Sequence, residues 1–139
     1  MMSADVKIHL RSVQKAGGEM DVNQTDATGR LTVSEDKRFI LRFDTADEYG
    51  TTSTTIKSND SGRITVTRKG ASQTKMEFDD KTPTPFIYHT PMGTLEFMLK
   101  TFEISTIIGD EPSLSLTLKY NIYNAGTPVS ENSIEITAL

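Results

Sequence analysis

The strict alternation of apolar and polar residues between positions 114 and 122 constrains the fold more than any other feature of this chain. Leu114, Leu116, Leu118, Tyr120 and Ile122 occupy every second position, which is the pattern of a β-strand with one buried face. The same period of two recurs in shorter segments, at 6–10, 39–43, 64–68, 76–78, 95–99 and 134–136. No stretch of ten residues combines a 3.6-residue apolar period with caps at both ends, so the sequence predicts an all-β fold.

Turn-forming residues separate these segments at short spacing. The predicted turns lie at 15–18, 28–30, 34–37, 59–62, 79–85, 107–112 and 124–128. About eight to ten antiparallel strands without a covering helix predict a single domain over residues 1–139, built as a sandwich or a closed up-and-down β-barrel. We favour the barrel because closure removes exposed strand edges. Phe102 and Ile104 have the opposite parity to Leu99, so a bulge or strand break is expected near Thr101.

Charge and composition narrow the range of partners. The chain carries 15 Lys and Arg against 19 Asp and Glu, a formal net charge of −4, and no cysteine. We therefore expect neither nucleic acid nor a membrane surface as a partner, and no disulfide or thiol chemistry. The N-terminus lacks a basic segment followed by a long apolar run, and no segment reaches the roughly 20 apolar residues of a membrane span, so we expect a cytoplasmic protein.

Residues that commonly carry catalysis are scarce or lie in predicted turns. His9 and His89 are the only histidines, too few for a histidine-based zinc site, and we expect no metal and no cofactor. The acidic pairs at 79–80 and 110–111 lie beside prolines, where carboxylates commonly form turns. No phosphate-binding glycine loop or nucleophile elbow is present. An enzyme, with a site at the barrel mouth, is therefore the least favoured class of function.

Arg68 is the most informative polar residue, because strand parity places it with Ile64 and Val66 on the inward face. One interpretation is a side chain whose stem packs inward while its guanidinium escapes at the end of the barrel. The other is an internal cation that binds an anionic group through two hydrogen bonds. If a protein carboxylate is its partner, Glu35 and Glu48 are the first residues to consider.

Three further residues complete the predicted ligand-binding set. Tyr88 and His89 precede the segment Thr90–Gly93, which is either a tight turn or a rim element that holds one of them over a ligand. Tyr120 lies on the inward face of its strand. We therefore predict a ligand site formed by Arg68, Tyr88, His89 and Tyr120, and we predict no catalytic residue.

Five short motifs occur in order along the chain. They are Arg68-Lys69-Gly70, Met76-Glu77-Phe78, Tyr88-His89-Thr90-Pro91-Met92-Gly93, Leu99-Lys100-Thr101 and Leu118-Lys119-Tyr120. Their order and spacing resemble the bacterial YwiB-like family, DUF1934, over essentially the whole chain. The resemblance implies a lipocalin-like (calycin) antiparallel barrel of cytoplasmic origin with no established activity. The family tends to carry an aromatic residue followed two positions later by a carboxylate, whereas this chain has Phe43-Asp44-Thr45. If that acid normally pairs with the arginine of the Arg-X-Gly motif, the partner here must come from elsewhere.

A barrel of about eight strands is either filled by its own side chains or holds one small ligand. The first hypothesis is a small-molecule-binding barrel for an anionic or amphipathic ligand, and the alternative is a solid-core structural or protein-interaction module. The inward positions are mostly large and apolar, which would fill much of an interior. An open cavity with Arg68 and Tyr120 in its wall would favour binding.

Overall fold

The computed structural model describes residues 1–59 and 62–139. Within these residues the chain forms ten β-strands and no helix, and so has no helix long and apolar enough to cross a membrane. The strands are β1 (Met2–Ala16), β2 (Glu19–Val33), β3 (Phe39–Asp47), β4 (Gly50–Ser58), β5 (Ile64–Lys69), β6 (Gln73–Phe78), β7 (Thr84–Thr90), β8 (Gly93–Gly109), β9 (Ser113–Asn124) and β10 (Thr127–Ala138). The turn predicted at 59–62 includes residues 60 and 61, which lie outside the described residues.

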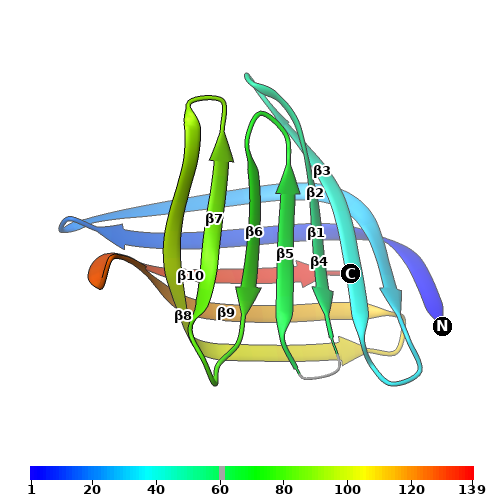
Figure 1. Cartoon of the computed structure of the whole chain (residues 1–139). Helices are drawn as coiled ribbons and strands as arrows, with labels where there is room; N and C mark the ends of the chain where they lie inside the picture. Colours follow the sequence, from blue (N-terminus) through cyan, green and yellow to red (C-terminus); the bar gives the residue numbers. More distant parts are fainter. Residues whose placement is uncertain (60–61) are drawn as a thin grey trace.

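The ten strands form one closed antiparallel barrel in which each strand pairs with its neighbours in the sequence (Figure 1). β1 closes the ring, because it pairs with β2 on one side and with β10 on the other. Beyond this pairing, the backbones of Lys7 and Leu139 exchange two hydrogen bonds of 2.9 and 3.0 Å. The all-β, up-and-down architecture predicted from the alternation is therefore confirmed.

The barrel is flattened into two layers whose strands cross at a large angle (Figure 1). The axes of β3 to β7 are aligned with one another, whereas those of β1, β9 and β10 cross them. β2 and β8 curve from one layer into the other. The register of β8 against β9 shifts between Thr101 and Glu103, which confirms the predicted bulge. Such bulges let a strand turn a corner between orthogonal sheets.

The predicted turn at 28–30 is wrong, because these residues lie within β2. Gly29 pairs with both Val6 and Phe43, and a Cβ placed on it would lie 2.3 Å from the carbonyl oxygen of Arg42. The glycine therefore permits a close approach between strands, not a chain reversal.

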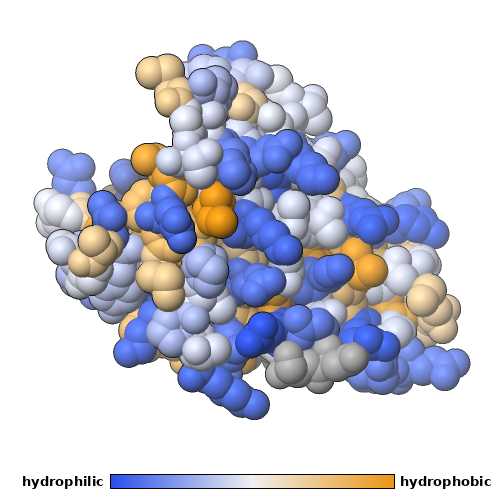
Figure 2. All heavy atoms as spheres, viewed as in Figure 1, coloured by the Kyte–Doolittle hydropathy of each residue, from blue (hydrophilic) through white to orange (hydrophobic). Residues whose placement is uncertain are grey.

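Inward-facing apolar side chains form one continuous core. The central members of β9 are buried as predicted, with Leu114, Leu116 and Leu118 at most 2% exposed. Phe39 and Phe78 are among the largest fully buried side chains. The face of the molecule seen in Figure 2 is mainly hydrophilic, with a small hydrophobic group over β7 and β8.

β6 and β7 share the shortest ladder of the ring, with only three residue pairs between 73–75 and 87–89. Two residues beyond the last pair, Pro85 would face Glu77, and proline has no N–H to donate. The hydroxyl of Thr84 donates instead to the carbonyl oxygen of Glu77 at 2.5 Å. Pro85, predicted to lie in the turn, is therefore accommodated within β7 at a seam where the ladder has already ended.

Candidate functional site

An interior cavity of about 450 Å³ lies between the two layers of the barrel. Its wall combines apolar and polar side chains from both layers. From β3 to β6 the wall includes Phe43, Thr45, Thr54, Ile56, Val66, Arg68 and Met76. From β1, β2, β9 and β10 it includes Leu10, Ser12, Gln14, Asn23, Thr25, Leu118, Tyr120, Asn132, Ile134 and Ile136. This cavity opens to solvent where its lining residues Gln14, Asn23 and Arg68 are exposed.

Arg68 lines this cavity from β5, on the face predicted by its parity with Ile64 and Val66. The residue is nevertheless exposed, because β5 ends one position later and its side chain lies at the rim. Among the described residues no carboxylate, Glu35 and Glu48 included, forms an ion pair with Arg68. Its charge keeps its contact with water, so the fold does not require the buried partner that strand parity suggested.

Tyr120 lines the same cavity from β9 and is 6% exposed. Its ring meets the buried ring of Phe78 edge-to-face, with centroids 4.8 Å apart. Burial raises the pKa of Tyr120 to about 12, and the nearby charge of Arg68 acts in the opposite direction. The phenol is therefore neutral at physiological pH and can both donate and accept a hydrogen bond.

Amide and hydroxyl groups form a polar wall opposite β5, and the sequence interpretation did not include them. Ser12 pairs with Asn23 on β2, and Gln14 pairs with Asn132 on β10. The side chain of Asn132 donates to the hydroxyl of Ser130 at 2.9 Å. The signal was present in the strand period, because Ser12 lies two positions after Leu10 and therefore shares its inward parity.

Tyr88 lies near the rim, away from the interior cavity. It is half-buried on the inward face of β7, with its ring centroid 6.3 Å from that of Phe86. A shallow depression at this rim is bordered by Arg68, Tyr88, Thr90 and Pro91. The Thr90–Gly93 segment forms a tight turn, in which the hydroxyl of Thr90 donates to the carbonyl oxygen of Gly93 at 2.8 Å. The structure thus brings Tyr88 close to Arg68 but not to Tyr120.

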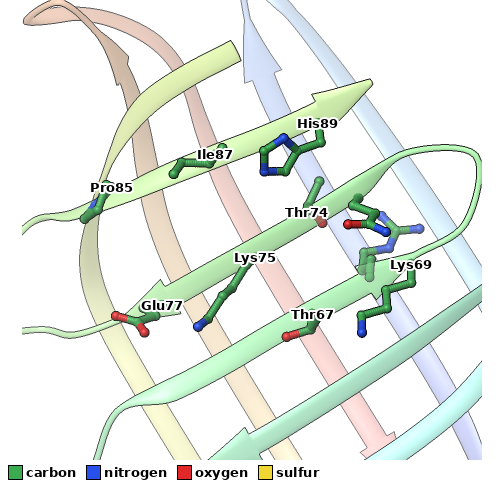
Figure 3. A pocket seen from close by; sticks show the side chains of 10 residues that line it. Thr67, Lys69, Thr74, Lys75, Glu77, Pro85, Ile87 and His89 are labelled. Atoms are coloured by element: carbon green, nitrogen blue, oxygen red, sulfur yellow. The ribbon is translucent and has the colours of Figure 1, made fainter. Parts of the chain in front are cut away.

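His89 lies on the outer face of the barrel (Figure 3). Its Nδ1 atom is 3.1 Å from the hydroxyl of Thr94. It borders an outer groove of about 560 Å³ that also contains Lys69, Lys75 and Ile87. His89 and Tyr120 therefore lie on opposite faces of the wall, and Arg68, at the rim, is the one described residue that borders both spaces.

The other histidine is also remote from the cavity. His9 is exposed on β1, with its Nδ1 atom 2.7 Å from a carboxylate oxygen of Asp26. Within residues 1–59 and 62–139, no group of three histidine or acidic side chains is arranged to hold a metal ion. The polar chemistry of the interior comes from one guanidinium, one phenol, and several amides and hydroxyls.

This architecture, a closed antiparallel barrel with a cavity between crossed layers, is that of the calycin-like β-barrels. Residues 8–136 match the family model described as "Domain of unknown function (DUF1934)", and the chain belongs to that family. A similar solved structure is the crystal structure of the ywiB protein from Bacillus subtilis, with a TM-score of 0.83 and 23% sequence identity. The similarity covers 98% of this chain and 91% of that chain, and at this identity it establishes the fold alone. A search of curated proteins found no match.

Proposed function

We propose that the protein binds a small molecule that carries an anionic group, with the anion at Arg68 and the body of the ligand in the interior cavity. The observation that carries this proposal is the presence of Arg68 in the cavity wall without an ion-pair partner among the described residues. A guanidinium can bind a carboxylate or a phosphate through two parallel hydrogen bonds. An anion from a bound ligand in the cavity could therefore pair with Arg68.

The cavity has the size and lining of a small-molecule site. Its volume of about 450 Å³ falls within the range of roughly 300–1,000 Å³ that is typical of such sites. Apolar side chains such as Ile56 and Leu118 give the ligand a surface to pack against, while the neutral phenol of Tyr120 adds a directional hydrogen bond. A solid-core module, the main alternative, would need this volume to be filled.

The test is a thermal-shift screen of small carboxylates and phosphates on the wild-type protein, Arg68→Met and Arg42→Met. Arg42 is the matched control, because it is an exposed arginine on the neighbouring part of the barrel that does not line the cavity. A ligand that binds only the folded state raises the melting temperature with concentration. We expect a saturable rise for wild type and Arg42→Met, and none for Arg68→Met. An equal rise in all three proteins would place the anion elsewhere.

The proposal includes a cytoplasmic location, and neither nucleic acid nor a membrane surface as a partner. The expected absence of these two partners is supported by the formal charge of −4, which disfavours binding to polyanionic surfaces. Gel-shift and vesicle-sedimentation assays with the purified protein test the absence of these partners.

A further inference from the structure

We infer that the ligand is a hydroxylated acid, such as a sugar acid, and not an alkyl acid of the same length. This inference rests on the proposed function, because it assigns the chemistry of the second end of the same ligand. It follows from the polar wall that β1, β2 and β10 contribute to the cavity. The members that matter are Ser12, Asn23, Thr25 and Asn132.

Strand pairing brings these groups together at one level of the barrel. Ser12 is paired with Asn23 on β2 and with Ile134 on β10, while Thr25 is paired with Leu10. Paired residues on antiparallel strands project from the same face of the sheet. The hydroxyl and amide groups therefore form a contiguous hydrogen-bonding surface directly beside the apolar part of the wall.

Most of these polar side chains form no hydrogen bond with another described group of the protein. Among the described residues, the side chains of Ser12, Asn23 and Thr25 make no hydrogen bond to other protein groups, and Asn132 makes one, to Ser130. Asn23 is exposed and Ser12, Thr25 and Asn132 are partly exposed, so water is their partner in the ligand-free protein. A ligand that displaced this water would have to replace its hydrogen bonds, since leaving the groups unpaired costs free energy. An alkyl chain would strip this wall of water without replacing its hydrogen bonds, whereas hydroxyl groups would replace them.

The two ends of the site lie on different layers of the barrel. Arg68 belongs to β5, which crosses the direction of β1 and β10 (Figure 1). A ligand that spans the space between the layers would place its acid at Arg68 and its other polar groups at Asn23 and Asn132. The apolar side chains between them, including Ile56, would contact the faces of the carbon skeleton.

Gluconate and hexanoate test this inference, because both are six-carbon monocarboxylates and they differ mainly in their hydroxyl groups. We expect isothermal titration of the wild-type protein to give roughly tenfold or greater preference for gluconate, since a site that hydrogen-bonds hydroxyls rejects an analogue that lacks them. Asn23→Leu should reduce this preference to about threefold or less. Asn121→Leu is the matched control on β9, outside the cavity lining, and should retain it.

The outcomes separate the two proposals. Equal affinity for both acids, or tighter binding of hexanoate, would overturn the inference about hydroxylated ligands, while loss of that binding in Arg68→Met would still support the anion site. An unchanged preference in Asn23→Leu would also overturn it. If neither acid binds at millimolar concentrations and the wider carboxylate and phosphate screen gives no shift that depends on Arg68, both proposals fail.

Discussion

The ring of Tyr120 packs edge-on against the ring of Phe78, with an angle of 69° between the two planes. One partner belongs to the fully buried core and the other to the cavity wall. The contact therefore packs the phenol ring against a fully buried side chain of the core. The hydroxyl at the far end of this ring is placed by packing and not by a hydrogen bond to another described side chain.

The burial of Tyr120 predicts a pH dependence of stability. Its pKa is raised from 10.0 to about 12 in the folded protein, so folding favours the protonated phenol. This contribution is fully present below pH 10 and is lost as the pH rises from about 10 to about 12, and it amounts to roughly 2–3 kcal/mol. Urea titrations across this range should show a steeper loss of stability for wild type than for Tyr120→Phe. Parallel curves for the two proteins would contradict the raised pKa.

Arg68→Met should change the stability of the ligand-free protein by less than about 0.5 kcal/mol, because the charge is exposed and has no ion-pair partner among the described residues. The same substitution should raise the pKa of Tyr120 further, since the cation that acts against burial is removed. Chemical denaturation measures the first effect and ultraviolet titration of the phenol measures the second. A destabilisation of several kcal/mol would instead reveal a buried acid left unpaired.

Leu116→Ala should destabilise the protein by roughly 2–5 kcal/mol, because Leu116 is 1% exposed and its truncation leaves a cavity in the core. Lys119→Ala, on the outer face of the same strand, is the control and should cost less than about 0.5 kcal/mol. Equilibrium unfolding in urea compares the two variants. Similar values for both would mean that the inward register of β9 is wrong.

Gly29→Ala should destabilise the barrel although the backbone of Gly29 is not in the left-handed region. The added methyl group would overlap the carbonyl oxygen of Arg42 and crowd the Cβ of Phe43, so β2 and β3 would have to separate. We expect a loss of about 1–3 kcal/mol, as for other overpacked sites. Thermal unfolding monitored by circular dichroism measures it, and an unchanged melting temperature would show that the two strands are less closely apposed.

Ala125→Asn should stabilise the β9–β10 hairpin. Ala125 has a φ of 49°, a left-handed conformation that is unfavourable for alanine and better tolerated by asparagine. A gain of about 0.5–1 kcal/mol is expected. Ala16→Asn is the comparison, because Ala16 lies in a strand without positive φ and should not gain. An equal change in the free energy of unfolding for both variants, measured in urea, would contradict the idea that the positive φ of Ala125 causes the gain.

The alternation of apolar residues predicted most of the fold. It located β1, β3, β5, β6, β8, β9 and β10, the inward face of β9 and the bulge near Thr101, because a period of two is a local consequence of burying one face of a strand. The strands β2, β4 and β7 are not among the segments that it marked. The position of Gly29 inside a strand, where it pairs with Val6 on one side and Phe43 on the other, could not be predicted in this way. Whether a glycine reverses the chain or admits a neighbouring strand depends on what packs against it.

The candidate site was only partly accessible from the sequence. Parity indicated that Arg68 and Tyr120 face inward, but the exposure of Arg68 depends on how far the neighbouring strands extend beyond it. His89 has outward parity relative to Tyr88, and the structure places it on the outer groove. Asn23 was overlooked because the apolar residues Met20 and Val22 have the opposite parity to Asn23, although both are exposed, and only its pairing with Ser12 identifies the face.

The proline beside the short β6–β7 ladder also affects how the protein can associate with other chains. Separation at these three pairs would expose one further edge on β6 and another on β7. The new β7 edge would carry Pro85, which cannot donate a backbone hydrogen bond to an incoming strand. Pro85 therefore removes one hydrogen-bond donor from the β7 edge, on which an intermolecular sheet could otherwise grow.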